Sequence, residues 1–378
     1  MLDSIMRAAP TKDDRSPQSR RVSALPPWST FGPFVALLVL ALGHGSALGV
    51  GLGLLLTAML LLAVLASVHH AEVVAHRVGE PYGTLVLAVA VTVIEVALIV
   101  SLMLAGGQAA NSLARDTVFA AIMIVCNGVI GLCLIVGGLR HHVMAFRVDG
   151  TSPALAALAA LAGLALVLPS FTTTTAGPSF SASQLAFAGV ASLVLYGIFV
   201  FVQTVRHRDY FLPLDANDVE SHADAPSNRT AWLCAGLLLV ALIGVVGLAK
   251  MLAPALKLFS ATVGAPESFA GVLIALIVLL PETGAAVRAA RNNRMQTSLN
   301  LALGSGLASI GLTIPVVAAI SPYFAFPLVL GLPPMQMVML ALTLIVGTLT
   351  LGSGRATVLH GAIHLVLFAA FLFLAVVP

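Results

Sequence analysis

The chain has 378 residues, of which 59% are hydrophobic and only 9% are charged, and its mean hydropathy is +1.05. An average soluble domain carries roughly 25% charged residues, so this composition excludes an ordinary soluble protein and indicates one that crosses a membrane many times. The formal net charge of +3 comes from loop arginines, and it does not indicate nucleic-acid binding. Because few segments alternate polar and apolar residues, the predicted fold is all-α rather than a β-barrel.

Apolar runs of membrane length follow a polar, Pro-rich segment at residues 1–30, which predicts a disordered cytoplasmic tail without a signal peptide. Runs of about 17 to 25 apolar residues are long enough to cross a bilayer as helices, and they predict about eleven transmembrane spans. The spans cover residues 32–45, 48–68, 83–105, 117–139, 153–170, 184–204, 231–252, 268–288, 299–320, 334–351 and 357–377. The first span is short, and it is either a full crossing or a half-span.

The basic residues in the loops predict the orientation, since short cytoplasmic loops collect Lys and Arg. With the N-terminus in the cytoplasm, every Lys and Arg except Arg115, Lys250 and Lys257 falls on the cytoplasmic side. This distribution predicts eleven crossings, with the C-terminus on the outer side of the membrane.

A polar interruption at residues 206–230 divides the chain into two hydrophobic halves, 31–205 and 231–378. It contains five acidic residues, and its composition favours a solvated linker over the alternative, an acidic segment that samples cations. We predict that this linker is cytoplasmic.

Two carboxylates, Glu95 and Glu282, lie near the middle of predicted spans, whereas the other acidic residues lie at or beyond span ends. A carboxylate in hydrocarbon is costly unless it takes up a proton or meets a cation, so each is a candidate functional group. The alternative is a neutral carboxyl group that forms hydrogen bonds between helices. The matching positions of the two acids favour a binding role.

The segments around the two acids are related. Residues 83–139 and 268–320 each contain a Glu-bearing span followed by a span with a polar residue among glycines. Four spans lie between the two acid-bearing spans, so the repeats have opposite orientations and predict a site near the midplane. Pro281 lacks an N–H, and it frees helix carbonyls near Glu282 that are suitable cation ligands. Further candidate oxygens belong to Thr92, Thr283, Asn127 and Ser305.

Histidines near the span ends have two interpretations. His69, Glu72 and His76 fall on roughly one helical face, which indicates either a metal or pH-sensing cluster or, as the sequence favours, a solvated helix end. His360 and His364 are one turn apart near the start of the last span. They form either a proton relay or, as the sequence favours, packed and hydrogen-bonded side chains.

Two segments carry a specific family resemblance: GEPYGTLVLAVAVTVIEVALIVSLML and GVLIALIVLLPETGAAVRAARNNRMQTSLNLALGSGLASIGLTIPVV. They resemble the two α-repeats of the calcium/cation antiporter superfamily, and the chain is similar to its bacterial proton-coupled branch, the ChaA-type antiporters. The resemblance also covers HAEVVAHRVGEPYG and RATVLHGAIHLVLFAAFL. It implies an inner-membrane antiporter, not an enzyme, that needs no cofactor and exchanges Ca²⁺, Na⁺ or K⁺ for protons at Glu95 and Glu282.

The resemblance also implies that backbone carbonyls one turn before each acid, at Val91 and Val278, approach the ion. Many relatives carry an Asn three residues before each Glu, where this chain has Thr92 and Leu279. The loss of an amide oxygen weakens the case for Ca²⁺ and strengthens the case for Na⁺ or K⁺.

Two functions from other classes remain as alternatives to antiport. A passive cation channel is one, although the chain contains no filter-like repeat of backbone carbonyls. An intramembrane metal-dependent enzyme is the other, although no His-rich group lies at the depth of the two acids.

Overall fold

The computed structural model is helical apart from one pair of very short strands, and it describes residues 25–43, 49–79, 82–106, 110–213, 226–266, 269–323 and 327–377. The predicted N-terminal tail and acidic linker fall largely on residues 1–24 and 214–225, which lie outside the described part. The helices are α1 (Pro27–Gly43), α2 (Val50–Val78), α3 (Tyr82–Gly106), α4 (Leu113–Met123), α5 (Ile130–His141), α6 (Val148–Ala162), α7 (Ala182–Phe201), α8 (Asn228–Val263), α9 (Phe269–Arg291), α10 (Met295–Ile320), α11 (Pro334–Leu351) and α12 (Val358–Val376).

The predicted spans are confirmed as helices, because each of the eleven apolar runs coincides with a helix or a continuous helical stretch. Nine of the described stretches are long and apolar enough to cross a membrane, and two shorter apolar helices cover Pro27–Gly43 and Ala90–Leu104. At about 1.5 Å per residue, α1 is roughly 26 Å long, slightly less than a hydrocarbon core of about 30 Å. The chain is therefore an all-helical, multi-pass membrane protein.

Three of the spans change helical register along their length. A π-helical turn at Ile124–Val129 joins α4 to α5, another at Gly163–Val167 extends α6, and a third at Val202–Arg206 ends α7. Such turns often lie at functional sites, because each inserts one residue and leaves the backbone locally short of a hydrogen-bond partner. The first of these turns contains the predicted site residue Asn127.

The loops sort into two groups at opposite ends of the helices. At one end, strand β1 (Met144–Ala145) pairs with β2 (Arg355–Ala356), and the His141 ring bonds the Arg291 carbonyl at 3.0 Å. At the other end, Val329 donates its N–H to the Asn111 carbonyl at 3.1 Å. The sorting matches the alternate crossings that the hydropathy predicts, whereas the assignment of one end to the cytoplasm stays a prediction.

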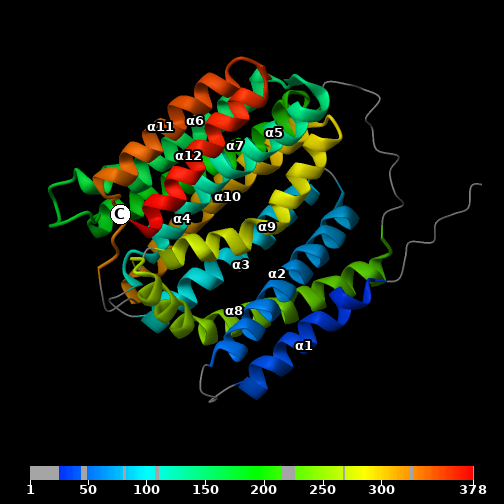
Figure 1. The fold of residues 1–378 in the computed structure, drawn as a ribbon, viewed down its shortest axis with the longest axis vertical. Coiled ribbons are helices and arrows are strands. Elements are labelled where there is room, and N and C mark those ends of the chain that lie inside the picture. Colours follow the sequence, from blue (N-terminus) through cyan, green and yellow to red (C-terminus); the bar gives the residue numbers. More distant parts are fainter. Residues whose placement is uncertain are drawn as a thin grey trace, which may run out of the picture.

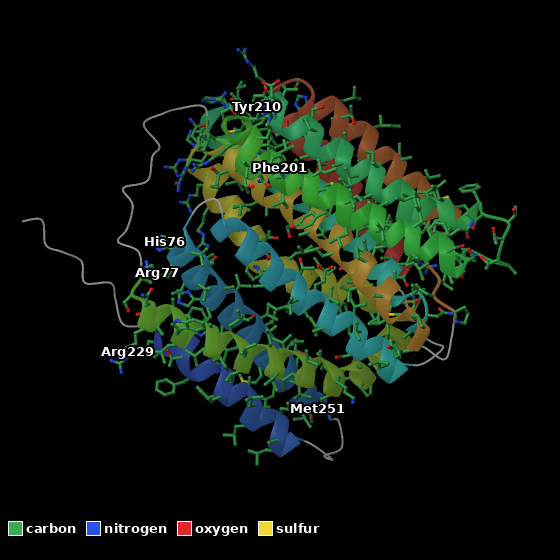
Figure 2. All side chains as sticks on the ribbon, turned by 180° about the vertical axis from the view of Figure 1, so that it is seen from behind. His76, Arg77, Phe201, Tyr210, Arg229 and Met251 are labelled. Carbon is green, nitrogen blue, oxygen red and sulfur yellow. The ribbon has the colours of Figure 1, made fainter. Side chains whose placement is uncertain are left out.

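The helices form two packed groups that α3 connects. Helices α1, α2 and α8 pack on one another, and α3 contacts α2 and α8 on one side and α10 on the other (Figure 1). His76 and Arg77 at the end of α2 lie near Arg229 at the start of α8, whereas Met251 lies toward the far end of that helix (Figure 2). The Arg77 Nε donates to the Asn228 side-chain oxygen at 2.7 Å, which fixes these two helix ends together.

Candidate functional site

Glu95 lies in the middle of α3 and is only 3% exposed. The Ser309 hydroxyl of α10 donates to the Oε2 atom of Glu95 at 2.7 Å, within the described interior. The Oε1 atom of Glu95 is also buried, and it has no hydrogen-bond partner among the described residues. A buried carboxylate oxygen without a donor is costly, so the structure leaves one oxygen of Glu95 available to a proton or a cation.

Glu282 lies on α9, is half-buried, and follows Pro281 inside the helix. Its Oε2 atom is buried and likewise has no hydrogen-bond partner in the part of the chain that the structure describes. Helix α9 contacts α3, which carries Glu95. The structure thus packs together the helices of the two acids that the sequence singles out, although the acids are 187 residues apart in the chain, from 95 to 282.

Each of the two helices that carry the acids contacts helices from the other half of the chain. Helix α3, from the first half, contacts α10 of the second half, and α9 contacts α4, the π-helical turn and α5 of the first half. Gly271 allows the second contact, because a Cβ atom there would lie 3.0 Å from the backbone nitrogen of Thr117. The two acids are therefore carried by helices that pack between the two halves, as expected for a site between two repeats.

The other predicted oxygens lie on the two acid-bearing helices, on α10 or in the π-helical turn. Thr92 is buried on α3, and the Thr283 hydroxyl donates to the Leu279 carbonyl of its own helix at 2.7 Å. Ser305 is half-buried on α10, one turn before the serine that bonds Glu95. The side chains of Val91 and Val278 are buried, and ligation by their carbonyls stays a prediction.

Asn127 is fully buried in the π-helical turn, and its side chain is engaged away from the acids. Its Nδ2 donates to the Thr343 hydroxyl of α11 at 2.8 Å, and its Oδ1 lies 3.2 Å from Nδ1 of His364 on α12. The structure therefore joins two residues that the sequence treats separately, Asn127 and His364. A direct role of Asn127 at the cation site stays a prediction.

The remaining candidates lie at helix ends. His360 accepts a hydrogen bond from the backbone N–H of Thr357 at 3.2 Å, so it caps the start of α12. Glu72 and His76 are exposed on α2, and His69 packs against Trp28 of α1 with ring centroids 5.4 Å apart. Among the described residues, no three His, Cys, Asp or Glu side chains gather into a group that could hold a metal ion. The charge of Glu72 nevertheless interacts with those of Arg288 and Glu282.

Sequence reasoning missed four of the polar residues that the structure brings into use. They are Ser309 beside Glu95, Thr343 beside Asn127, Thr350 beside His364, and His70, whose Nε2 bonds the Ser29 carbonyl of α1 at 2.8 Å. A signal existed for the first, because Ser309 is four residues after Ser305 and so lies on the same helical face. The sequence carries no comparable signal for the others.

Comparison with known proteins places this chain among ion transporters. A family model described as sodium/calcium exchanger protein matches residues 48–205 and 233–377. The chain is 51% identical over 361 residues to the putative ionic transporter y4hA of Sinorhizobium fredii, which covers 95% of this chain and 98% of that relative. It is 38% identical to the sodium-potassium/proton antiporter ChaA of Escherichia coli over 346 residues, 90% of this chain and 93% of the relative.

Two solved structures share the fold at low sequence identity. The structure of native YfkE aligns with a TM-score of 0.69 at 18% identity and covers 93% of this chain and 99% of its own. The crystal structure of the H⁺/Ca²⁺ exchanger CAX aligns with a TM-score of 0.67 at 16% identity and covers 91% and 86%. At these identities the likeness concerns the arrangement of helices alone.

Proposed function

Because the chain belongs to the sodium/calcium exchanger protein family, we propose that it is a secondary active antiporter that exchanges cytoplasmic cations for external protons at Glu95 and Glu282. The relative from Escherichia coli, at 38% identity, is a sodium-potassium/proton antiporter by name, which supports proton coupling here. The chemistry of the two acids gives the proposal its mechanism.

The observation that carries the proposal is a pair of buried carboxylate oxygens, Oε1 of Glu95 and Oε2 of Glu282, that have no donor in the described part of the chain. Burial disfavours a charged carboxylate, a neighbouring carboxylate disfavours it further, and a bound cation favours it. Protons and cations therefore compete for the same two oxygens. When access to the site alternates between the two sides of the membrane, this competition becomes exchange, and the proton gradient drives cation export.

The oxygens around the acids favour a monovalent ion. Ca²⁺ takes about six to eight oxygen ligands, so every missing ligand weakens its binding. The side chain three residues before Glu282 is Leu279, which is buried and offers no oxygen, and the corresponding position before Glu95 is Thr92. We propose Na⁺ and K⁺ as the preferred cations and Ca²⁺ as a weaker substrate.

The proposed setting is the inner membrane of a bacterium, with the N-terminus in the cytoplasm and the C-terminus outside. The excess of basic residues on one side of the predicted spans supports this orientation. The loop group that contains β1 and β2 is then cytoplasmic, and the loop group that contains Asn111 and Val329 faces outward.

An exchange assay in inside-out vesicles tests the proposal. A pH gradient, acidic inside, is imposed and followed with a fluorescent reporter, and Na⁺, K⁺ or Ca²⁺ is added outside the vesicles. We expect proton efflux with the wild-type protein and none with Glu95→Gln or Glu282→Gln, because an amide keeps the shape of the side chain but cannot release a proton. Asp149→Asn, the same change at an exposed acid of α6, serves as the matched control with full exchange.

Two outcomes contradict the proposal. If both glutamine variants retain full exchange, the two acids are not the site. If cation flux is independent of the pH gradient, the protein is a passive channel.

A further inference from the structure

Four polar side chains from three different spans form a continuous chain of hydrogen bonds in the interior. Asn127 belongs to the π-helical turn, Thr343 and Thr350 to α11, and His364 to α12. All four are at most 2% exposed. Burying four polar groups is costly unless every donor and acceptor is matched, and a fully matched network fixes the elements that it joins in one arrangement.

The chemistry of the partner atoms indicates which atom donates in each bond. The Thr343 hydroxyl donates to the Met339 carbonyl at 2.8 Å, so it accepts from the Asn127 amide nitrogen, also at 2.8 Å. The amide oxygen of Asn127 then faces Nδ1 of His364 at 3.2 Å, and this nitrogen must carry the proton. Nε2 of His364 is left to accept from the Thr350 hydroxyl at 3.1 Å. In this arrangement the imidazole is neutral, and both of its nitrogens are hydrogen-bonded to side chains of the network.

His364 also joins α12 to the irregular backbone of the π-helical turn. The N–H of Ile130, just after the turn, bonds the carbonyls of Asn127 and Val125, three and five residues earlier. The hydrogen bond between the His364 ring and the Asn127 side chain therefore ties α12 to the stretch where the helical register changes.

Glycines let α12 come close enough for this contact. A Cβ atom on Gly361 would lie 2.9 Å from the carbonyl oxygen of Gly131, and one on Gly131 would lie 3.1 Å from the carbonyl oxygen of Gly361. Contacts this short involve backbone atoms, which cannot yield, so α5 and α12 cross where only glycine fits. His364 is three residues after Gly361 and therefore lies on the same side of α12, against the π-helical turn.

The π-helical turn in turn touches the helices that carry the acid site. It contacts both α9, which bears Glu282, and α10, which bears Ser309. The Val125 side chain packs on α10, 3.4 Å from where a Cβ of Gly306 would lie. A shift of the turn would therefore move α9 and α10 relative to each other.

We propose that His364 is a positioning residue for the two-acid site, holding the π-helical turn against α9 and α10 and so setting the spacing of the cation ligands. This role rests on the proposed function and adds to it a residue that does not itself touch the ion. Groups that orient ligands in this way typically contribute roughly 10- to 100-fold to metal affinity.

The first test separates affinity from turnover in the vesicle assay. We expect His364→Leu to raise the half-saturating Na⁺ or K⁺ concentration by roughly 10- to 100-fold, with a smaller effect on the maximal rate. His364→Asn should recover much of the loss, because its amide nitrogen can take the place of Nδ1 opposite Asn127. His360→Leu is the matched control, with the same change one turn earlier on α12, and it should leave the half-saturating concentration unchanged.

The second test uses Cys126 as a reporter of the π-helical turn, independently of transport. Cys126 is 2% exposed, and Cys133→Ala with Cys234→Ala leaves it as the single thiol. We expect a membrane-permeant maleimide to label Cys126 several-fold faster in His364→Leu than in the parent protein. If the wild type shows no exchange, the proposed function fails, whereas the labelling still tests the role of His364.

Unchanged half-saturation together with unchanged labelling in His364→Leu would overturn the inference, as would a fall in maximal rate alone. If His364→Leu does not fold, Thr350→Val replaces it. That variant removes only the donor to Nε2, and it should shift both readouts in the same direction by a smaller factor. No shift in either readout for a folded Thr350→Val and a folded His364→Asn would also overturn it.

Discussion

The hydrogen bond between Ser309 and Glu95 gives the sharpest test of the candidate site. The Ser309 hydroxyl and the Glu95 carboxylate are 2.7 Å apart, and their side chains are 2% and 3% exposed. A hydrogen bond to a buried charged group contributes roughly 1.5 to 3 kcal/mol. Ser309→Ala removes the donor and so penalises the charged carboxylate, which is the form that binds a cation. Since about 1.4 kcal/mol corresponds to a tenfold change, the half-saturating cation concentration should rise by roughly 10- to 150-fold.

The measurement is proton efflux from inside-out vesicles as a function of added Na⁺ and K⁺, at equal amounts of membrane-inserted protein. Ser309→Thr keeps a hydroxyl and should stay close to the wild type. Ser305→Ala is the matched control, because it makes the same change one turn earlier on α10 at a half-buried serine. We expect it to have little effect.

The opposite ranking would refute this reasoning. If Ser305→Ala raises the half-saturating concentration and Ser309→Ala does not, the working state of the site uses the hydroxyl that the sequence indicates, and the observed bond to Glu95 has no role in cation binding. Equal and small effects of both variants would mean that neither hydroxyl supports the acid.

Two further predictions concern stability, measured by thermal unfolding of the purified protein in detergent. Gly271→Val should lower the free energy of unfolding by roughly 1 to 3 kcal/mol, because the new Cβ would lie 3.1 Å from the backbone of Asp116 on α4. Gly284→Ala, on the same helix but in open space, should leave the stability unchanged or raise it slightly. Equal melting temperatures of the two variants would contradict the close packing of α4 and α9. Arg115→Met should lower the free energy of unfolding by roughly 3 kcal/mol, because it leaves the buried Asp116 carboxylate without the guanidinium that now lies 2.7 Å away. Arg115→Lys should restore part of this stability. A melting temperature of Arg115→Met equal to that of the wild type would show that this ion pair contributes nothing.

Hydropathy predicts the helices well because the membrane leaves the backbone few choices. A segment in hydrocarbon must satisfy its own hydrogen bonds, so an apolar run of sufficient length becomes a helix. Residues 334–351 are predicted as a span and form α11 over the same range, Pro334–Leu351. The prediction for α10 begins four residues late, at 299 instead of Met295, because Gln296 and Ser298 are polar, yet both are buried within the helix.

Register and long-range pairing are what the sequence does not reveal. The π-helical turn at Ile124–Val129 has no hydropathy signal, since inserting one residue leaves an apolar run apolar. Its partner His364 is 237 residues from Asn127, and no local pattern relates the two. The paired acids could be predicted because each is individually costly in a membrane, whereas the choice of Ser309 over Ser305 depends on how α3 and α10 are rotated against each other.

The two acids are supported in different ways, and the difference explains why a network as distant as that of His364 would matter. Glu95 has a direct donor on α10, Ser309, which fixes its carboxylate in place. Glu282 has a buried oxygen without a donor among the described residues, and its helix is positioned mainly by contact with α4, the π-helical turn and α5. The position of Glu282 therefore depends on how rigid that span is. A matched buried network at the π-helical turn strengthens the side of the site on which a buried carboxylate oxygen, Oε2 of Glu282, has no donor among the described residues.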